Sequence, residues 1–365
     1  MNQYLLSNFN NNTLEYDLSQ FNWGELVLTI VKEKFPSVNS LEFVHTTLSP
    51  TEISEITLHV QNRFLDEEFS QMFDRFAEIY IKPLINNEEY LIKRQPTLNV
   101  VIPNQTKVGR RLPFHQGIFY DNGRGQGTVW MPLTKCYESN SMWVVDLDVS
   151  RKITKDVINF KWSVEQFEEE CMKYAYPVTL DPGQAHLFNQ EIIHGNINNE
   201  TEITRMAIDW HVLIKNEEYH RRLPGGFFRR PGDYIYNLDI NCKKSFICYI
   251  ANNSNFDQHI PKYAQRSVIE KYLTKFGIRH NGWQFENEYL NHMPIFEHLL
   301  DQNIQAIVLF SMYSIPDRLI NKALELNIEL HFANEFMVLR SQADLDKILY
   351  YKNFAIEKKG KLLHE

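Results

Sequence analysis

Apolar residues recur at helical spacing from the N-terminus to about residue 95. Residues 23–35 form one such stretch, and a proline directly after it ends the helical pattern. A second stretch, 49–64, opens with Ser-Pro, because serine caps helices and proline suits the first helical turn. A third stretch, 66–81, opens with an aspartate that is expected to act as its cap. The pattern therefore predicts an N-terminal group of helices.

From about residue 98 the pattern changes to short stretches of β-branched and aromatic residues bounded by turn residues. The expected strands are 98–102, 128–131, 141–146, 177–180, 185–188 and 205–213. One helix is expected among them, at 164–174. Many short strands with Gly/Pro turns are typical of a barrel or a double-sheet jelly roll.

A polar, turn-rich segment follows, and after it strands and helices alternate. Strands are expected at 245–250, 306–310 and 328–332, and helices at 261–276, 293–300 and 316–326. This βαβ order predicts a small α/β domain with a parallel sheet. The predicted fold class is therefore α+β: N-terminal helices with a double-stranded β-helix (jelly-roll) barrel, then the α/β domain. The expected boundaries are 1–220 for the first domain, 221–244 for a linker and 245–365 for the second domain.

Composition excludes several classes of protein. The formal net charge of the 365 residues is −8, which argues against non-specific nucleic-acid binding. Apolar runs are too short for a transmembrane helix, and the N-terminus lacks the pattern of a signal peptide. The cysteines at 136, 171, 242 and 248 have no CxxC spacing and read as reduced thiols. We therefore expect a cytoplasmic protein without nucleic-acid or membrane partners, and we also consider a homodimer.

Two histidines and an arginine are the candidate chemistry of the strand-rich region. His115 and His194 each follow a strand-like stretch beside glycine and turn residues, and Arg205 opens the next strand. Antiparallel strands of a jelly roll bring such residues to one mouth of the barrel. Two histidines and a carboxylate on Fe(II) leave positions for a keto acid and oxygen, and arginine suits the distal carboxylate of the keto acid. The pattern favours a mononuclear iron site; purely structural histidines are the alternative.

Over about 85–225 the chain resembles the phytanoyl-CoA-hydroxylase-like 2-oxoglutarate/Fe(II) oxygenases. The nearest branch is named for a streptomycin-biosynthesis enzyme and for oxygenases of sporadic carbohydrate gene clusters. The motifs that carry the resemblance are 95–103, 114–116, 129–133, 139–143 and 194–205. The resemblance implies Fe(II) and 2-oxoglutarate as cofactors, with His115 and His194 as catalytic iron ligands. It also implies that Arg205 holds the C5 carboxylate of 2-oxoglutarate, with Asn140 and Thr128 as further contacts.

Gly117 departs from this pattern, which has Asp or Glu two residues after the first histidine. A halide could bind where the carboxylate is absent, as in iron halogenases with a His-x-Gly motif. Another acid could instead reach the metal, with Glu191 as the first candidate and Asp121 and Glu138 as others near in sequence. Water could also complete the coordination shell, or the glycine could simply serve a turn. The open-coordination position at Gly117 therefore leaves the third ligand undecided.

An arginine cluster and a second resemblance complete the picture. Arg221, Arg222 and Arg229, with Arg230, are candidates for binding the diphosphate of a nucleotide-activated sugar, although a solvated linker explains them equally well. Residues 245–340 resemble the small sporadic carbohydrate-cluster protein family, which implies a pathway context and no catalytic residue.

Two functions from different classes follow from the sequence. The first is an Fe(II)/2-oxoglutarate-dependent oxygenase that uses O2 to oxidise, most simply to hydroxylate, a small-molecule carbohydrate. Its alternative within the same chemistry is an iron halogenase. The second is a non-catalytic sugar-binding or scaffold module with a degenerate metal site, for which the glycine at 117 is also suited.

Overall fold

The computed structural model describes residues 7–104, 113–120, 122–215, 218–219, 224–234, 240–251, 260–286, 293–302, 304–354 and 356–357. Internal contacts divide the chain into two compact units. The N-terminal unit comprises Met1–Arg222, Phe228–Gly232 and Gly360–Glu365, and the C-terminal unit Leu223–Phe227 and Asp233–Lys359. The segment expected to be a linker is thus shared between the units. The α+β fold class is confirmed.

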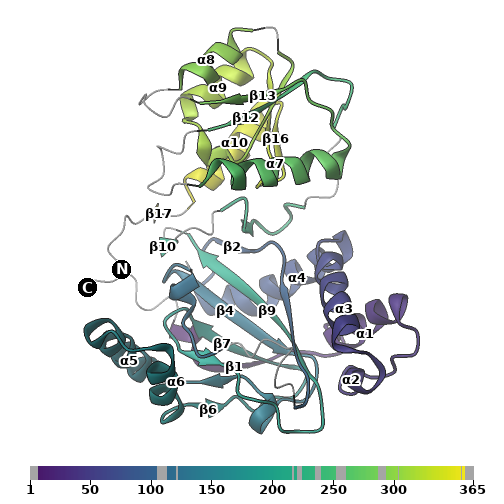
Figure 1. The fold of residues 1–365 in the computed structure, drawn as a ribbon, viewed down its shortest axis with the longest axis vertical. Helices are drawn as coiled ribbons and strands as arrows, with labels where there is room; N and C mark the ends of the chain where they lie inside the picture. The colour runs from purple at the N-terminus through teal and green to yellow at the C-terminus, as the bar shows by residue number, and fades with distance from the viewer. Residues whose placement is uncertain are drawn as a thin grey trace. The chain divides into compact units, whose positions relative to one another are not determined.

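The N-terminal unit contains two antiparallel sheets in a jelly-roll-like arrangement (Figure 1). The larger sheet has the order β1-β7-β4-β9-β2-β11, and β3 pairs with β9 beside β2. Its strands are β1 Asn10–Glu15, β2 Tyr90–Lys93, β3 Thr97–Val101, β4 Gln126–Pro132, β7 Gln184–Asn189, β9 Arg205–Ile214 and β11 Phe228–Arg229. The smaller sheet has the order β6-β5-β8, with β5 Trp143–Val144, β6 Tyr176–Pro177 and β8 His194–Gly195. The short strand β10 is Glu218–Tyr219.

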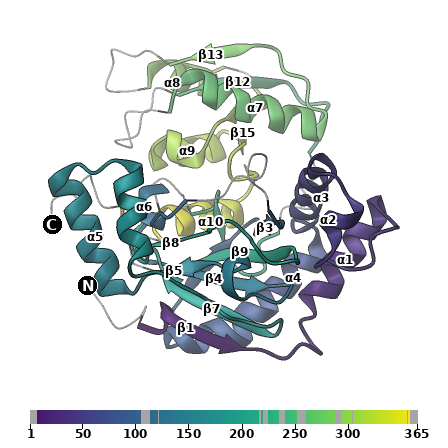
Figure 2. The same cartoon turned by 60° about the horizontal axis from the view of Figure 1, so that its bottom comes forward.

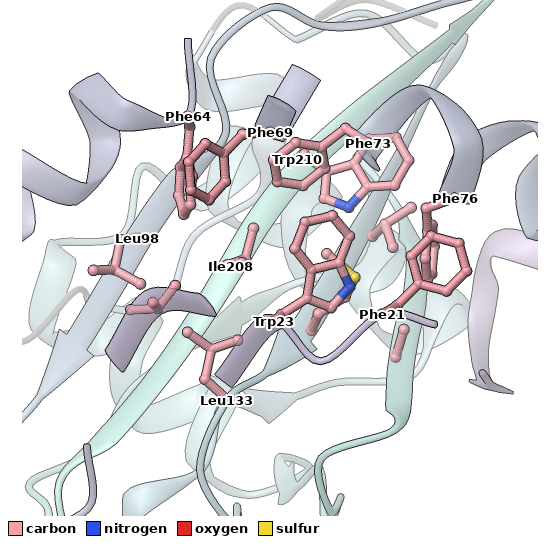
Figure 3. Close-up of a cluster of buried hydrophobic side chains, with 14 of the residues drawn as sticks. Phe21, Trp23, Phe64, Phe69, Phe73, Phe76, Leu98, Leu133, Ile208 and Trp210 are labelled. Atoms are coloured by element: carbon pink, nitrogen blue, oxygen red, sulfur yellow. The ribbon is translucent and has the colours of Figure 1, made fainter. Parts of the chain in front are cut away.

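The predicted N-terminal helices cover one face of the larger sheet (Figures 1 and 2). They are α1 Trp23–Lys34, α2 Val44–Thr47, α3 Pro50–Arg63 and α4 Glu67–Phe76, which continues as a π-helix over Ala77–Ile81. Ser49 and Glu52 form a capping box at the start of α3, which explains why the helix begins there. Trp23 stacks on Phe73 with ring centroids 4.5 Å apart, and both lie against the sheet near Trp210 (Figure 3).

Side-chain alternation gives the strands of the larger sheet two different faces. On β9, Met206, Ile208 and Trp210 pack in the helix-covered core. The intervening Ala207 packs instead in a second cluster with side chains from the smaller sheet, such as Val144. The face of β9 that carries Arg205, Ala207 and Asp209 therefore looks into the space between the two sheets. This is the interior of the jelly roll.

Some expectations for this unit were wrong in detail. The stretch 141–146 forms only the two-residue β5, and 177–180 contributes β6 and a single bridge between Leu180 and Cys136. The helix α5, Leu147–Phe160, was not expected; Ile153 of this helix is buried, and Val149 and Val157 pack beside it at helical spacing. It precedes α6 Val164–Met172, and both lie on the side of the sheet away from α1–α3 (Figure 2).

The C-terminal unit is a five-stranded sheet in the order β13-β12-β14-β15-β16. The first four strands are parallel, as the sequence predicts, whereas β16 joins antiparallel. The strands of this sheet are β12 Phe246–Ile250, β13 Trp283–Phe285, β14 Ala306–Leu309, β15 Glu329–Phe332 and β16 Met337–Leu339; the short strand β17, Ile356–Glu357, is not part of it. The helices are α7 Lys262–Phe276, α8 Pro294–Leu300, α9 Asp317–Glu325 and α10 Gln342–Lys352.

Alternation on β12 shows that helices cover both faces of this sheet. Cys248 packs in the cluster that contains Ile269 of α7. Tyr249 points the other way and contacts Phe296 of α8, with ring centroids 4.9 Å apart. All four cysteines of the chain are free. Across the ranges described above, none of the helices combines the length and apolar character that crossing a bilayer requires.

Candidate functional site

A pair of main-chain hydrogen bonds brings the two predicted histidines together. His115 lies just before the 3-10 helix Gly117–Tyr120, and His194 begins β8. Each backbone N–H donates to the carbonyl oxygen of the other residue, at 2.9 Å in both directions. The imidazole centroids are 4.3 Å apart. The jelly roll therefore places two side chains from distant parts of the sequence side by side.

Both imidazoles have the tautomer that a metal ligand needs. His115 Nδ1 lies 2.9 Å from the carbonyl oxygen of Pro113, and His194 Nδ1 lies 3.0 Å from that of Ile192. A carbonyl oxygen only accepts, so each Nδ1 carries the proton and each Nε2 keeps its lone pair. Neither Nε2 forms a hydrogen bond within the described part of the chain. Fixing the ring through the nitrogen away from the metal is the usual support of a ligating histidine.

Burial keeps these imidazoles neutral. Burial, with a smaller contribution from the neighbouring His115, lowers the pKa of His194 to about 3. Burial also lowers the pKa of His115 below its ordinary value. Because a protonated imidazole cannot bind a metal, both shifts favour metal binding at neutral pH.

Arg205 is a buried cation whose hydrogen bonds are only partly satisfied. Its Nη2 donates to Asn196 Oδ1 at 2.7 Å, and its guanidinium lies 5.5 Å from the centroid of the Trp130 ring. Its buried Nε has no hydrogen-bond partner, and no acid of the described residues forms an ion pair with it. Burial lowers its pKa from the ordinary value. A buried guanidinium with free donors fits a ligand carboxylate.

Asp209 and His211 were missed at the sequence level. They occupy alternate positions of β9 after Arg205, on the interior face. Asp209 Oδ1 lies 3.3 Å from both Lys93 Nζ and His211 Nε2. Burial acts to raise the pKa of Asp209, but the attraction of Lys93 and His211 lowers it overall. The signal was present: charged residues at every second position of an otherwise apolar strand indicate a polar interior.

The space beside Gly117 is filled by a side chain that the sequence did not indicate. A Cβ atom built on Gly117 would overlap Gln190 Oε1 and lie 2.8 Å from Gln190 Cδ. Gln190 Oε1 accepts a hydrogen bond from Asn122 Nδ2 at 2.8 Å, and Gln190 Nε2 donates to Thr128 Oγ1 at 2.7 Å. The predicted open-coordination position is thus bordered by an amide.

Glu191 is occupied by arginines. Its Oε2 lies 2.7 Å from Arg151 Nη2, and its Oε1 lies 3.5 Å from Arg124 Nε. A role as third metal ligand would require Glu191 to leave these partners. Asp121, another acid considered, lies outside the described residues. Among the residues that the structure describes, no group of three or more His, Cys, Asp or Glu side chains could hold a metal ion.

The remaining predicted contacts are tied to other groups. Asn140 is fully buried, and its side chain bonds the backbone of its own turn at Tyr137 and Lys135. Thr128 accepts from Gln190, as above. Roles for both in binding the cosubstrate stay predictions.

The arginine cluster does not gather as a site in the described part of the chain. Arg229 is buried, with Nη2 at 2.6 Å from Asp74 Oδ1 of α4 and 3.2 Å from the carbonyl oxygen of Ser70. This ion pair leaves no reason to assign Arg229 a substrate phosphate. Arg221 and Arg222 lie outside the described residues.

Comparison with known proteins gives distant similarities. No family model matches the chain. The streptomycin biosynthesis protein StrG of Streptomyces griseus is 25% identical over 126 residues, which are 34% of this chain and 47% of StrG. The chain thus spans about half the length of this curated relative.

Similar solved structures include the nickel complex of the non-heme monooxygenase ThoJ, with 14% identity and a TM-score of 0.36 over 57% of this chain and 77% of that one. EctD from S. alaskensis with bound Fe has 14% identity and a TM-score of 0.35, over 59% and 79% of the two chains. The alpha-ketoglutarate-dependent carbocyclase SnoK from nogalamycin biosynthesis has 11% identity and a TM-score of 0.33, over 60% and 86%. Scores of this size leave the site to be judged on its own contacts: two neutral histidines with bare Nε2 atoms, and a buried arginine with free donors.

Proposed function

We propose that the N-terminal unit is a non-heme Fe(II)/2-oxoglutarate-dependent oxygenase. The observation that carries the proposal is the histidine pair, in which both Nδ1 atoms are bound to carbonyl oxygens and both Nε2 atoms are left for a metal. Imidazole nitrogen suits iron among the first-row metals. The same two residues are the ligands that the sequence resemblance implies.

In this proposal His115 and His194 hold Fe(II) through Nε2, and Arg205 binds the C5 carboxylate of 2-oxoglutarate. The unpartnered Nε of Arg205 and its remaining N–H groups supply the donors that a carboxylate needs. Bound iron and cosubstrate supply the oxidising chemistry, in which O2 converts 2-oxoglutarate to succinate and CO2 while a substrate C–H bond is oxidised. The protein keeps the two histidine ligands neutral and holds Arg205 in a buried position where it can bind a carboxylate.

We further propose that the substrate is a sugar or a nucleotide-activated sugar. The support is the resemblance of residues 85–225 to oxygenases of carbohydrate gene clusters, together with the similarity to a protein of streptomycin biosynthesis. Halogenation of such a substrate receives less support, because the Gln190 amide borders the position where a halide would bind.

Anaerobic titration tests the function directly. Purified protein with Fe(II) and 2-oxoglutarate should give a weak visible charge-transfer band, and under air it should form succinate without added substrate. His194→Ala and His115→Ala should each abolish both signals. A band that persists at full strength in either variant would refute the ligand assignment.

A non-catalytic binding module is the second candidate. The observation that favours it is that no three-ligand group exists among the described residues. If the wild-type protein neither binds Fe(II) nor forms succinate, yet still binds a sugar, this candidate replaces the oxygenase.

A further inference from the structure

The side chains of Gln190 and Asn122 lie against the backbone at Gly117, and Gln190 connects them to Thr128 of β4, on the same face as Gln126. We name Asn122, Gln126, Gln190 and Thr128 the carboxamide cluster; all four are more than nine-tenths buried. Gln190 connects Asn122 and Thr128 through the two hydrogen bonds described above. The cluster carries no charge, and it lies where the sequence pattern of the resemblance has an acid.

Main-chain hydrogen bonds fix Gln190 against the segment that follows His115. The N–H of Ile118 donates to the carbonyl oxygen of Gln190 at 3.2 Å, and the N–H of Asn122 donates to that of Gly117 at 3.2 Å. The side chain of Gln190 then occupies the volume of the missing side chain at residue 117. Only glycine leaves room for it, so Gly117 and Gln190 form a matched pair.

Unpartnered buried atoms in the cluster are a second, independent observation. The Oδ1 atom of Asn122 and both amide atoms of Gln126 are buried and have no hydrogen-bond partner. Gln126 and Thr128 lie two residues apart on β4 and therefore share a face. Buried polar atoms are costly when left unsatisfied, so this arrangement indicates a site that completes its bonding with a ligand.

We propose that Gln190 replaces the absent carboxylate, offering a neutral amide oxygen to a divalent metal held by His115 and His194. The proposal rests on the proposed function, since it concerns the same metal. With Gln190 as the third ligand, the ligand set is neutral, and an amide oxygen occupies the position where a halide would bind. Because that oxygen carries partial negative charge, it disfavours an anion at this position.

Co(II) is the probe for this assignment, with the dissociation constant measured by visible absorption titration of the full chain. Gln190→Ala should weaken Co(II) binding by about tenfold or more, the usual effect of removing a group that supports a metal site. Gln190→Glu should tighten it, because Asn122 Nδ2 and the Thr128 hydroxyl can both donate to a carboxylate. Gln265→Ala is the matched control: Gln265 is equally buried, and its amide bonds two carbonyl oxygens in the C-terminal unit.

The matched pair gives a readout that does not depend on metal. Gly117→Asp should lower Tm by several degrees, since its side chain overlaps Gln190. The double variant Gly117→Asp with Gln190→Ala should recover most of that loss and bind Co(II) more tightly than wild type.

Two results would overturn the inference. One is an unchanged Co(II) dissociation constant in both Gln190 variants while the wild type binds Co(II), which leaves the proposed function standing. The other is a chloride-dependent change in the Co(II) spectrum of the wild type that is absent from Gly117→Asp, because that difference would locate the anion site at Gly117. A wild type that binds no Co(II) would refute the metal site and this inference together.

Discussion

His115 and His194 take their tautomer from main-chain carbonyl oxygens two residues earlier in each case. A carboxylate in that role would add negative charge to the ligand itself. Here a main-chain carbonyl oxygen accepts the Nδ1 hydrogen bond, so each imidazole stays a neutral ligand. With Gly117 in place of an acid, Asp209 is the acid whose charge acts on both histidines, which raises its importance.

Arg205→Lys should separate cosubstrate binding from metal binding. Lysine keeps the charge but loses the planar fork, so 2-oxoglutarate affinity should fall by about tenfold or more. Co(II) affinity should stay near that of wild type. Isothermal titration of 2-oxoglutarate into Co(II)-loaded protein measures the effect, with the exposed Arg266→Lys as control. Equal loss of Co(II) and 2-oxoglutarate binding would instead indicate a structural role for Arg205.

Asp209→Asn should destabilise the N-terminal unit. Lys93 is buried, and its Nζ would lose a charged partner 3.3 Å away, at a cost of about 3 kcal/mol. Adding Lys93→Met should recover much of that loss, because it removes the buried ammonium whose charge Asp209 balances. Urea unfolding of the two variants and wild type measures both changes. Additive losses in the double variant would show that the two side chains are not coupled.

At the scale of elements, the contact between β8 and the segment before His115 determines the site. Gly195→Ala should damage it, because the new Cβ would lie 2.8 Å from both the Cα and the N of Phe114. Backbone atoms cannot yield as a flexible side chain can, so the bridge between His115 and His194 should open. We expect a loss of stability of about 1–3 kcal/mol and much weaker Co(II) binding. Gly282→Ala is the matched control, since its Cβ would meet nothing within 4 Å.

Periodicity predicted the elements that bury a regular face. The helices α1 and α3 and the strands β4, β7 and β9 follow their sequence patterns closely. The two-residue strand β5 could not be bounded from the sequence, because its pairing partners are remote: β6 and β8. The helix α5 was predictable from its pattern, because Val149, Ile153 and Val157 recur at helical spacing and pack in one cluster.

The sequence predicted those parts of the site in which a single residue type, such as histidine, indicates the chemistry. The expected histidine pair does meet, because the backbone bridge between His115 and His194 brings their rings together. Gln190 was not foreseeable, because a glutamine has no special spacing and its role depends on an empty Cβ position elsewhere in the chain. The pairing of Glu191 with Arg151 and Arg124 was equally hidden, since the sequence does not show which of several arginines lies beside a given acid in the fold.

For the whole N-terminal unit, we expect protonation of His186 to lower the free energy of unfolding at acidic pH. Burial lowers its pKa to about 4, and its Nε2 lies 3.2 Å from Asn11 Oδ1. Below about pH 6.5 the unfolded chain binds a proton at this histidine that the folded unit refuses, so folding weakens until about pH 4. The full effect is on the order of 3 kcal/mol.

Unfolding free energies measured in urea from pH 7 to pH 4.5 check this dependence. His186→Gln should reduce the pH slope, because the variant cannot be protonated and its amide can still donate to Asn11. His59→Gln is a suitable control, since His59 is partly exposed near Glu33 at the surface. Identical slopes in wild type and His186→Gln would place the acid sensitivity elsewhere.

The reciprocal hydrogen bonds between His115 and His194 also have a kinetic meaning. They close one of the long loops of the unit, and long loops are closed at an entropic cost that must be met before the contact contributes. A metal that needs both rings therefore binds only the folded state, in which the contact between His115 and His194 has formed. Bound metal should lower the unfolding rate and leave the refolding rate nearly unchanged, so the folded state lasts longer but does not form faster.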